Sequence, residues 1–549
     1  MIPFTPASLR GARPAFLLDV TFAGHRWCIG TAAVSLDSDD GPVQYSPGLD
    51  LRGIDESFDR LELDPAAQSA TLAAVLPDGA SVLDLIARGH RLDRCLATVA
   101  MIYVDANGQP IAMANGSAQT WENRAILIAG RIQQPQYGAI DKPNGWFGCT
   151  VRDSLWEDTG SIIPTTSRVN TTTWPNSRAA DAGKVYPLVF GAPGQDGNGV
   201  DGYKGSPAYV VVSTAGNADL LLIAGHPVAA TTVTLIDTST TVEGFTVTHQ
   251  ADGMGNICAV VDVTGASGAF DRTGTEYWVC WSSTAAATGG MALAESANGT
   301  AVAGVGSLMV YMLNRSTIPA DHGRCAAARR QLDRVDVGGY INDADASPWG
   351  FISDELLKLV PCSVRRGPKG VYPLPRFEIP RSSAIPALAE GPDFRRLAVQ
   401  VEETKPAASV EVLYLTAATL TSPSVTWIRA MPAAPTDTTA SRSLLLRPEG
   451  QAVRVDSPLL WTREAADAVA VGVLIGRPVE AVTVTYSAAA EYAWVSPGDW
   501  VAVTDDDTDR GLYWTSRVGQ VTGRSWDGTG WEFSIFFETR APFPARRYG

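Results

Sequence analysis

The sequence predicts a mainly β, multidomain protein, built from several small β-barrel or β-sandwich domains with a few amphipathic α-helices. Three observations predict this class. Short segments rich in aliphatic and aromatic residues recur between Gly, Asp and Asn turns. Gly (52) and Pro (35) exceed average usage and Trp is plentiful at 15, which is typical of many short strands joined by tight turns. The length of 549 residues leaves room for roughly three or four domains.

Residues 1–160 are predicted to form an N-terminal barrel-like domain. The segment FLLDVTFAGHRWCIG carries Leu18, Val20 and Phe22 on one face around an Ala-Gly-His turn, which indicates a hairpin. Further strands are expected in LATVAMIYVD and AILIAGRI. The helix expected here lies in SVLDLIARG and ends at Gly89. A small barrel flanked by one helix follows.

A central mixed α/β domain is predicted for residues 161–205 plus 284–390, and it opens with a buried strand in GKVYPLVFGAPG. Residues 206–283 interrupt it. They read as six short strands at the spacing of an inserted β-sandwich or barrel module, namely AYVVVS, DLLLIAG, TTVTLID, GFTVTH, ICAVVDV and EYWVCW.

Helical periodicity appears in the second half of the central domain and predicts three amphipathic helices. The apolar faces of the first two comprise Val305, Leu308, Met309, Met312 and Leu313, and then Cys325, Ala328, Leu332 and Val335. The third lies in FISDELLKLV, with Ile352, Leu356 and Val360 in register before Pro361 ends it.

A β-rich connecting domain (391–455) and a C-terminal domain of a helix plus a barrel (456–549) complete the chain. The helix stripe comprises Ala466, Val469, Ala470, Val473 and Leu474. In the last predicted strand Trp531, Phe533, Ile535 and Phe537 point one way, so one face of this strand belongs to a core.

Composition excludes several classes of protein. The formal charge is −15 and charged residues make up 18%, which disfavours a nucleic-acid reader. No run of about 18 apolar residues predicts a membrane span, and the N-terminus lacks the pattern of an export signal. The seven cysteines are odd in number and form no CxxC pair, which indicates a reduced compartment.

Motifs for catalysis are missing from the sequence, so we expect no enzyme and no catalytic, cofactor-binding or metal-binding residues. No GxSxG elbow is present, and the glycine pair Gly197 and Gly202 is followed by Tyr203-Lys204-Gly205 instead of the lysine and hydroxyl of a phosphate-binding loop. Five histidines occur without paired metal-ligand spacing.

The acidic turn Asp505 to Asp509 resembles a calcium loop because its oxygens alternate. Its glycine, Gly511, arrives one position late, and Ser516 stands where a bidentate Glu would be required. A solvated hairpin tip is the favoured interpretation, and metal binding here stays an open question. Asp343 and Asp345 receive the same interpretation.

Aromatic and basic residues near the C-terminus offer two more candidate surfaces. Five tryptophans crowd the last block, and we favour a core or subunit-interface role over sugar stacking for Trp494, Trp500, Trp514, Trp526 and Trp531. The C-terminal segment is basic and could dock on the acidic face of a neighbouring protein, although a frayed terminus is the commoner explanation. Its arginines are Arg540, Arg546 and Arg547.

Several stretches resemble the baseplate hub or tail-tip proteins of long, non-contractile-tailed bacteriophages and of gene-transfer-agent particles. They are the run from Phe16 to Ile54 followed by AILIAGRIQQPQYG, the segment GKVYPLVFGAPG, and the series from the Ala466 helix through VSPGDWVAVTDDDTDRGLYWTSRVGQVT. The inserted module resembles this family least. The iron–sulfur site of some tail-tip relatives is not expected, because no cysteine follows Cys362.

The resemblance implies a structural virion protein: a homotrimeric ring of barrel-like domains that continues the tail tube. Its partners would be the distal tail protein ring, fibre or tip proteins and the end of the tape measure. DNA would pass through the lumen without specific binding, and the acidic excess would repel phosphate. The protein would be assembled in the host cytoplasm and located in the tail baseplate, with a role in host attachment and genome ejection.

Three alternatives stay open. The chain could be a distal tail or receptor-binding component of the same tail. It could instead be an extracellular carbohydrate-binding or carbohydrate-active β protein, which the tryptophans and the acid excess motivate. Finally, the inserted module could bind host-surface sugars while the rest is scaffold.

Overall fold

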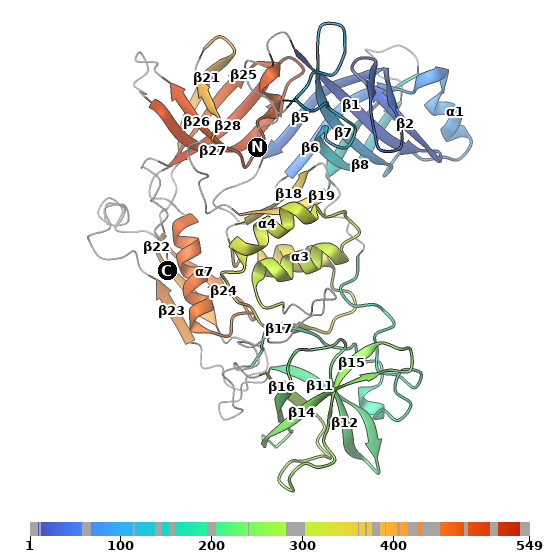
Figure 1. Ribbon diagram of the computed structural model, residues 1–549, viewed down its shortest axis with the longest axis vertical. Helices are drawn as coiled ribbons and strands as arrows, with labels where there is room; N and C mark the ends of the chain where they lie inside the picture. Colours follow the sequence, from blue (N-terminus) through green and yellow to red (C-terminus); the bar gives the residue numbers. More distant parts are fainter. Residues whose placement is uncertain are drawn as a thin grey trace.

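A computed structural model of the chain describes residues 9, 12–57, 67–113, 116–137, 145–153, 160–194, 205–239, 241–281, 302–360, 362–367, 370–375, 385–389, 391–402, 407–414, 426–430, 451–476, 481–505 and 514–538. They form three tiers along the long axis of the molecule (Figure 1): two barrels side by side, a middle tier that holds the larger helices, and a third barrel at the far end. The predicted fold class, mainly β and multidomain with few helices, is confirmed.

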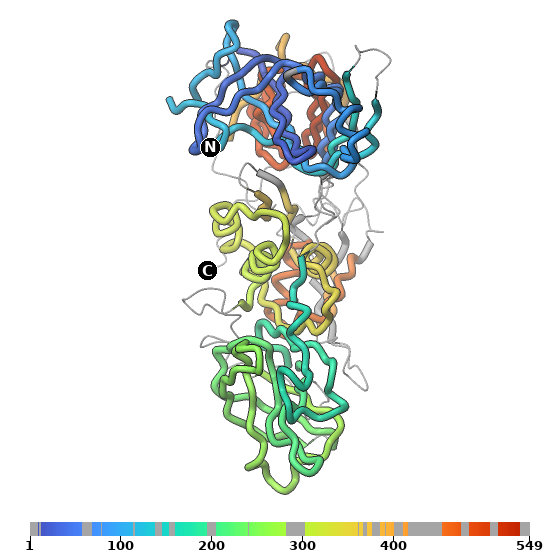
Figure 2. Tube along the Cα trace, turned by 90° about the vertical axis from the view of Figure 1, so that its right-hand side faces the viewer, coloured from blue at the N-terminus to red at the C-terminus, as the bar shows by residue number. Residues whose placement is uncertain are grey.

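The N-terminal barrel closes through its own strand order. Its strands are β1 (Arg13–Phe22), β2 (His25–Gly30), β3 (Val34–Leu36), β4 (Val43–Pro47), β5 (Leu49–Ser57), β6 (Ala67–Val75), β7 (Leu96–Val104), β8 (Ala125–Tyr137) and β9 (Trp146–Asp153). Neighbours follow the order β5-β6-β9-β8-β7-β1-β2-β4, with β3 beside β4. Because β4 runs directly into β5, the order returns to its first strand, and the sheet curls into the ring seen in blue in Figure 2.

Gly48 makes the bend between β4 and β5 possible. Its φ of +151° is rare for residues with a side chain, and an added Cβ would lie 2.7 Å from Val75 Cγ1. Its N–H donates to the Gly30 carbonyl at 3.0 Å and its carbonyl accepts from Val75 N–H at 2.9 Å. The bend is therefore bonded to strands on both sides.

The local signals read from the sequence in this barrel match the structure. Ala23 and Gly24 both have positive φ, 54° and 78°, as a two-residue hairpin turn requires. A short 3₁₀ turn, η1 (Pro77–Gly79), precedes helix α1 (Val82–Ala87). The Ser81 hydroxyl accepts from the Asp84 N–H at its start, and Gly89 follows its end with φ +92°.

The C-terminal barrel is an open one in the described residues: its strands pair in the order β21-β25-β28-β27-β26-β20, and β20 and β21 at the two ends do not pair with each other. Their bounds are β20 (Ala387–Ala389), β21 (Phe394–Glu402), β25 (Ala481–Ala488), β26 (Trp500–Asp505), β27 (Trp514–Trp526) and β28 (Trp531–Glu538), with the 3₁₀ helix η6 (Ala490–Trp494) after β25. The predicted inner face of β28 is buried throughout, and Phe536 on the other face is buried as well.

These two barrels share one sheet. Strand β27 of the C-terminal barrel pairs antiparallel with β5 of the N-terminal barrel, from Gly523 opposite Ser57 to Trp526 opposite Ile54. One apolar cluster also extends through both, so their interiors form a single core.

The middle tier combines helices with small sheets. Its elements are β10 (Leu188–Phe190), α3 (Val305–Arg315), α4 (His322–Leu332), β17 (Gly339–Ile341), α5 (Pro348–Phe351), η4 (Ile352–Leu356), β18 (Cys362–Gly367), β19 (Gly370–Pro375), β22 (Ala407–Tyr414), β23 (Thr426–Ala430), β24 (Gln451–Asp456) and α7 (Arg463–Gly476). The short helix η3 (Ala179–Asp181) instead lies against the third barrel, where the Val210 N–H donates to the Asp181 carboxylate at 3.2 Å. Helices α3 and α4 cross closely at Gly306, where an added Cβ would lie 2.5 Å from the Arg329 carbonyl oxygen. The predicted stripe of α7 contributes Ala466, Val469 and Ala470 to the core.

The third predicted helix in this tier differs from its sequence pattern. The segment begins with the four-residue helix α5, continues as the π-helical turn η4, and then forms turns up to Val360. Ile352, Leu356 and Val360 are all buried, as predicted. These residues pack in the same core as α3 and β10 without forming a regular helix, because tertiary packing outweighs the helical periodicity of the sequence.

The third barrel lies within residues 206–283. Six strands, β11 (Ser206–Thr214), β12 (Asn217–Ala224), β13 (Thr232–Ile236), β14 (Val242–Ala251), β15 (Ile257–Asp262) and β16 (Tyr277–Cys280), close in the order β11-β12-β15-β14-β13-β16. Of the two architectures expected for this module, the structure adopts the barrel. The division of the chain into five domains stays a prediction.

Candidate functional site

The most unusual chemistry in the described chain is a buried carboxylate where three regions meet. Glu56, at the end of β5, is 1% exposed. Its Oε2 accepts from Arg524 Nε of β27 at 2.9 Å, and its Oε1 accepts from Gln68 Nε2 of β6 at 2.9 Å. The same Oε1 accepts from Arg365 Nη2 of β18, in the middle tier. We call Glu56, Gln68, Arg365 and Arg524 the junction.

The two arginines of the junction are as buried as the carboxylate. Arg524 Nη1 donates to the carbonyls of Ala493 and Val495 at 3.1 and 3.0 Å, and its guanidinium lies 5.2 Å from the centre of the Trp531 ring. Burial by itself lowers the pKa of Arg365, but the adjacent Glu56 charge outweighs it and the pKa is raised. Arg365 therefore stays charged in the folded protein.

The backbone beside the junction is also closely packed. Gly498 has φ +91°, and a side chain there would collide with Leu374 of β19 and with the Arg365 guanidinium. Its carbonyl accepts from Gln520 Nε2 at 3.2 Å. The middle tier thus meets the C-terminal barrel in direct contact, with a glycine where the approach is tightest.

A second buried carboxylate, Asp19 on β1, stabilises the outer face of the N-terminal barrel. It pairs with Arg26 and Arg124, each at 2.8 Å, and accepts from Tyr45 Oη at 3.1 Å. Burial and this carboxylate raise the pKa of Cys28 to about 12, which leaves the thiol protonated and unreactive at neutral pH. The cluster is therefore suited to holding the fold.

The acidic turn after β26 is described only at its first residue. The Asp505 carboxylate is fully buried, 3.0 Å from Arg396 Nη1 and 3.3 Å from Tyr486 Oη. The interpretation of a solvated tip is wrong for Asp505, because its charge is neutralised inside the barrel. Asp506 to Asp509 and Gly511 lie outside the described residues. Within the described ranges, no three His, Cys, Asp or Glu side chains gather as metal ligands would.

The structure places most of the other candidates in ordinary structural roles. Trp514, Trp526 and Trp531 are buried. The Trp526 and Trp531 rings lie 5.2 and 6.4 Å from the Phe16 ring of the N-terminal barrel, so these two bridge the barrels, while Trp514 packs on Phe537 within the C-terminal barrel. Asp343 accepts from the Asp345 N–H at 2.9 Å in a local turn. Outside the described residues lie Gly197, Gly202, Lys204, Arg540, Arg546 and Arg547.

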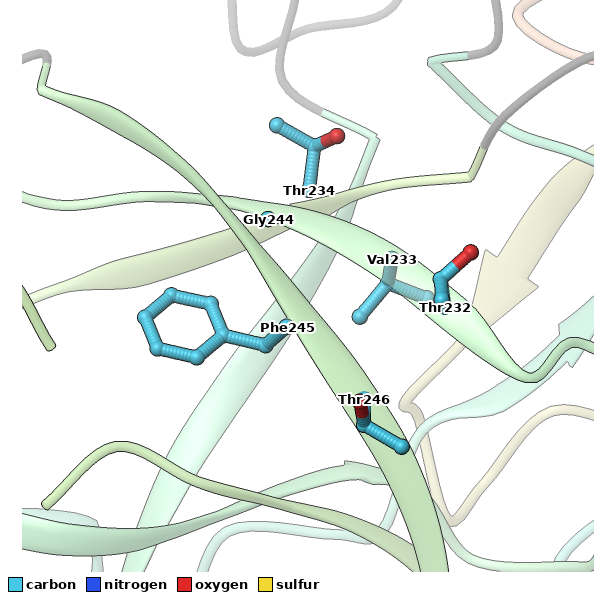
Figure 3. A pocket seen from close by; sticks show the side chains of 6 residues that line it. All are labelled: Thr232, Val233, Thr234, Gly244, Phe245 and Thr246. Carbon is cyan, nitrogen blue, oxygen red and sulfur yellow. The ribbon is translucent and has the colours of Figure 1, made fainter. Parts of the chain in front are cut away.

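The described part of the molecule includes two shallow or small hollows. One, of about 90 Å³, lies between β7, β8 and η6, and it is lined in part by Tyr103, Gln119 and Arg524. The other is a shallow depression of about 250 Å³ on β13 and β14 of the third barrel (Figure 3). Neither brings together a nucleophile with a base. Every helix in the described ranges is too short or too polar to cross a bilayer.

Sequence reasoning missed the junction. Glu56 stands at a strand position where the neighbours alternate between core and solvent, and a charge on the core side is the signal that was available. Nothing local identifies its partners, because 468 residues separate Glu56 from Arg524.

Known proteins resemble this chain only weakly. No family model matches the chain, and no curated protein matches it. Among solved structures it is similar to the 43 kDa tail protein of prophage MuSo2 from Shewanella oneidensis, with 9% identity, a TM-score of 0.33, and coverage of 95% of this chain and 98% of that one. It is also similar to a chain of the virion of a native gene transfer agent particle, with 11% identity, a TM-score of 0.36, and coverage of 69% and 91%. Likenesses at these TM-scores do not establish a family for the chain.

Proposed function

We propose that this chain is a structural component of a phage-type tail, the hub or tail-tip ring that continues the tail tube. One observation carries the proposal. The stretches of sequence that resemble tail hubs at the two ends of the chain come together in one sheet, through the pairing of β5 with β27. The names of the two similar structures, a prophage tail protein and a gene transfer agent virion, belong to the same class of assembly.

A rigid pair of barrels suits a load-bearing ring. The junction and the shared core hold the two barrels in one orientation, and Arg365 connects them to the middle tier. Three copies would place six such barrels around an axis, which is the trimeric ring that the resemblance implies. An acidic excess of −15 per chain would keep a DNA-conducting lumen from binding phosphate.

Strand β21 offers a surface for the neighbouring copy. In the described part of the sheet β21 pairs with β25 alone, so its other edge is open to hydrogen bonding. Leu397 and Val399 on this strand are 49% and 43% exposed. An open edge that carries apolar side chains favours pairing with another chain.

The oligomer tests the proposal. The purified chain should form trimers by analytical ultracentrifugation, and Leu397→Lys with Val399→Lys should dissociate them while the circular dichroism spectrum is kept. Val242→Lys is the matched control, since Val242 is 37% exposed on the third barrel, and it should leave the trimer intact. A stable monomer with wild-type sequence would contradict the ring.

Location in the particle separates the hub from its alternatives. Electron microscopy of particles that carry a labelled chain should place the label on the tail axis at the tip. A peripheral or hexameric position would instead indicate a distal tail or receptor-binding component. Turnover by the purified chain in a panel of glycoside substrates would contradict the structural, non-enzymatic role.

A further inference from the structure

Exposed apolar side chains mark two places on the pair of barrels. Among the described residues of this pair, the large hydrophobic side chains that stay exposed belong either to β21 or to the region around α1. On β21 they are Leu397 and Val399. Around α1 they are Leu83 and Leu96, each 56% exposed, and Tyr137 of β8 at 40%. Such side chains, gathered in one place, are typical of an interaction surface.

These two places lie on opposite sides of the pair, as the positions of α1 and β21 in Figure 1 show. Leu96 is the first residue of β7 and follows the loop after α1. Near the other end of the same strand, Tyr103 Oη donates to the Glu491 carbonyl of η6 at 2.7 Å. The C-terminal barrel is therefore joined at one end of the N-terminal barrel, and α1 faces away from it at the other.

The loop after α1 adds positive charge to this region. Arg88, Arg91 and Arg94 are exposed, and none of the three forms an ion pair with another described residue. Three arginines against Asp93 give the loop a formal charge of +2, in a chain whose net charge is −15. Burial raises the pKa of Tyr137 and the nearby Asp93 charge raises it further, so this ring lies beside the loop.

The backbone of this loop is held in place. Leu92 at its centre is fully buried. The Arg94 N–H donates to the Ile132 carbonyl of β8 at 2.8 Å, and the Arg94 carbonyl accepts from Arg131 Nη1 at 3.0 Å. A fixed backbone reduces the entropy that is lost when the surface binds a partner. The surface, which we call the arginine end, consists of Leu83, Arg88, Arg91, Arg94, Leu96 and Tyr137.

The symmetry of a ring requires two different surfaces on each copy. Rotation about a three-fold axis places one side of a copy against the other side of the next copy, so every contact in the ring is heterologous. The β21 surface can therefore not meet β21 of the neighbouring copy. Its partner must lie on the opposite side of the pair, which is where the arginine end is found.

The two surfaces also match in charge. Carboxylates stand at both ends of β21: Asp393 is exposed just before it, Glu402 is its last residue, and Glu403 follows. On the strand itself Arg396 is buried in an ion pair, which leaves Arg395 as its exposed arginine. An apolar centre with a largely acidic rim complements an apolar centre with a basic rim.

We propose that the arginine end of one copy binds the β21 surface of the next copy in the ring. The apolar side chains of the arginine end pack on Leu397 and Val399, and its guanidinium groups bind the carboxylates that flank β21. The inference deepens the proposed function and rests on it, because it names the second half of the contact that closes the ring.

A charge reversal tests the arginine end. Arg88→Glu with Arg91→Glu changes two exposed side chains and should raise the dissociation constant of the trimer at least about tenfold, because like charges then meet across the contact. Sedimentation velocity measures it, and circular dichroism checks the fold. Arg13→Glu with Arg330→Glu is the matched control. Both arginines are exposed and lie outside the two surfaces, so the trimer should be unchanged.

Mixing two variants identifies the partner of each surface. The variant Arg88→Glu with Arg91→Glu keeps an intact β21 surface, and the variant Leu397→Lys with Val399→Lys keeps an intact arginine end. Each variant alone should be monomeric. Equal amounts of the two should form a 1:1 dimer through the one intact contact, without closing into a ring. Native mass spectrometry of the mixture measures this product.

The outcomes separate this inference from the ring itself. A wild-type trimer that Arg88→Glu with Arg91→Glu leaves intact would overturn the inference, keep the ring, and assign the arginine end to a different acidic partner. A mixture of the two folded variants without the 1:1 dimer would overturn it as well. A monomeric wild-type chain would contradict both the ring and the inference.

Discussion

The pair of barrels at one end of the molecule and the barrel at the other end are stabilised in different ways. The pair shares a sheet, an apolar cluster and the buried junction around Glu56. The third barrel closes its own sheet around an apolar cluster to which a few residues of the middle tier contribute, and a second cluster packs its strands against Trp174 and Tyr186. The pair must therefore fold and move as one body, while the third barrel can vary with limited effect on the two joined barrels.

Removal of the junction carboxylate is expected to have the largest effect. Glu56→Ala leaves Arg365 and Arg524 as buried charges without their counter-charge, and this should lower the free energy of unfolding by about 3–5 kcal/mol. Chemical denaturation followed by tryptophan fluorescence measures it. Loss of hydrogen-exchange protection should spread to both barrels of the pair; loss confined to β5 would contradict the single body.

A cavity in the third barrel should destabilise the protein by a similar amount, but the effect should be confined to that barrel. Leu235 is fully buried there, and Leu235→Ala should destabilise that barrel by about 2–5 kcal/mol. Hydrogen exchange should rise in β11 to β16 while β5 and β27 keep their protection. If exchange in β5 and β27 rises equally, the third barrel is not independent of the pair.

Acid should loosen the contact between the third barrel and the middle tier. His226 Nε2 accepts from the Val189 N–H of β10 at 3.0 Å, and burial lowers the pKa of this histidine to about 4. Below about pH 6.5 the His226 side chain therefore binds a proton in the unfolded chain but not in the folded chain. The contribution of His226 to the free energy of unfolding is complete above that pH and declines as the pH falls towards 4.

Protonation of His226 should lower the free energy of unfolding by at most about 3 kcal/mol, and solvent access to the side chain makes this loss smaller. Thermal unfolding between pH 7 and pH 4 measures it, with His226→Gln as the variant in which the decline should shrink. An unchanged decline in that variant would assign the pH dependence to other groups.

The smallest effect is expected for an ion pair on the same strand as Glu56. Asp50 and Arg52 lie 3.4 Å apart, and both side chains are more than a third exposed. Asp50→Asn should change the free energy of unfolding by no more than about 0.5 kcal/mol, because water screens the pair. If Asp50→Asn lowers the free energy of unfolding about as much as Glu56→Ala does, burial does not explain the large effect expected at the junction.

Local patterns in the sequence determined much of this protein. The hairpin turn at Ala23 and Gly24, helix α1 with Gly89 beyond its end, the buried stripe of α7 and the inner face of β28 were all predictable. Each depends on residues only a few positions apart, through backbone preference or side-chain period. The mainly β class follows from the same signals.

Tertiary structure alone decided the features that give the molecule its rigidity. The pairing of β5 with β27, the contact of Glu56 with arginines 309 and 468 residues away, and the burial of Asp505 against Arg396 all join distant segments. A strand pattern states which face is buried but not which strand lies beside it, and a charged residue shows its type but not its partner. Only the folded chain buries these charged groups together. A carboxylate that would be expected at the surface then forms a buried ion pair with an arginine.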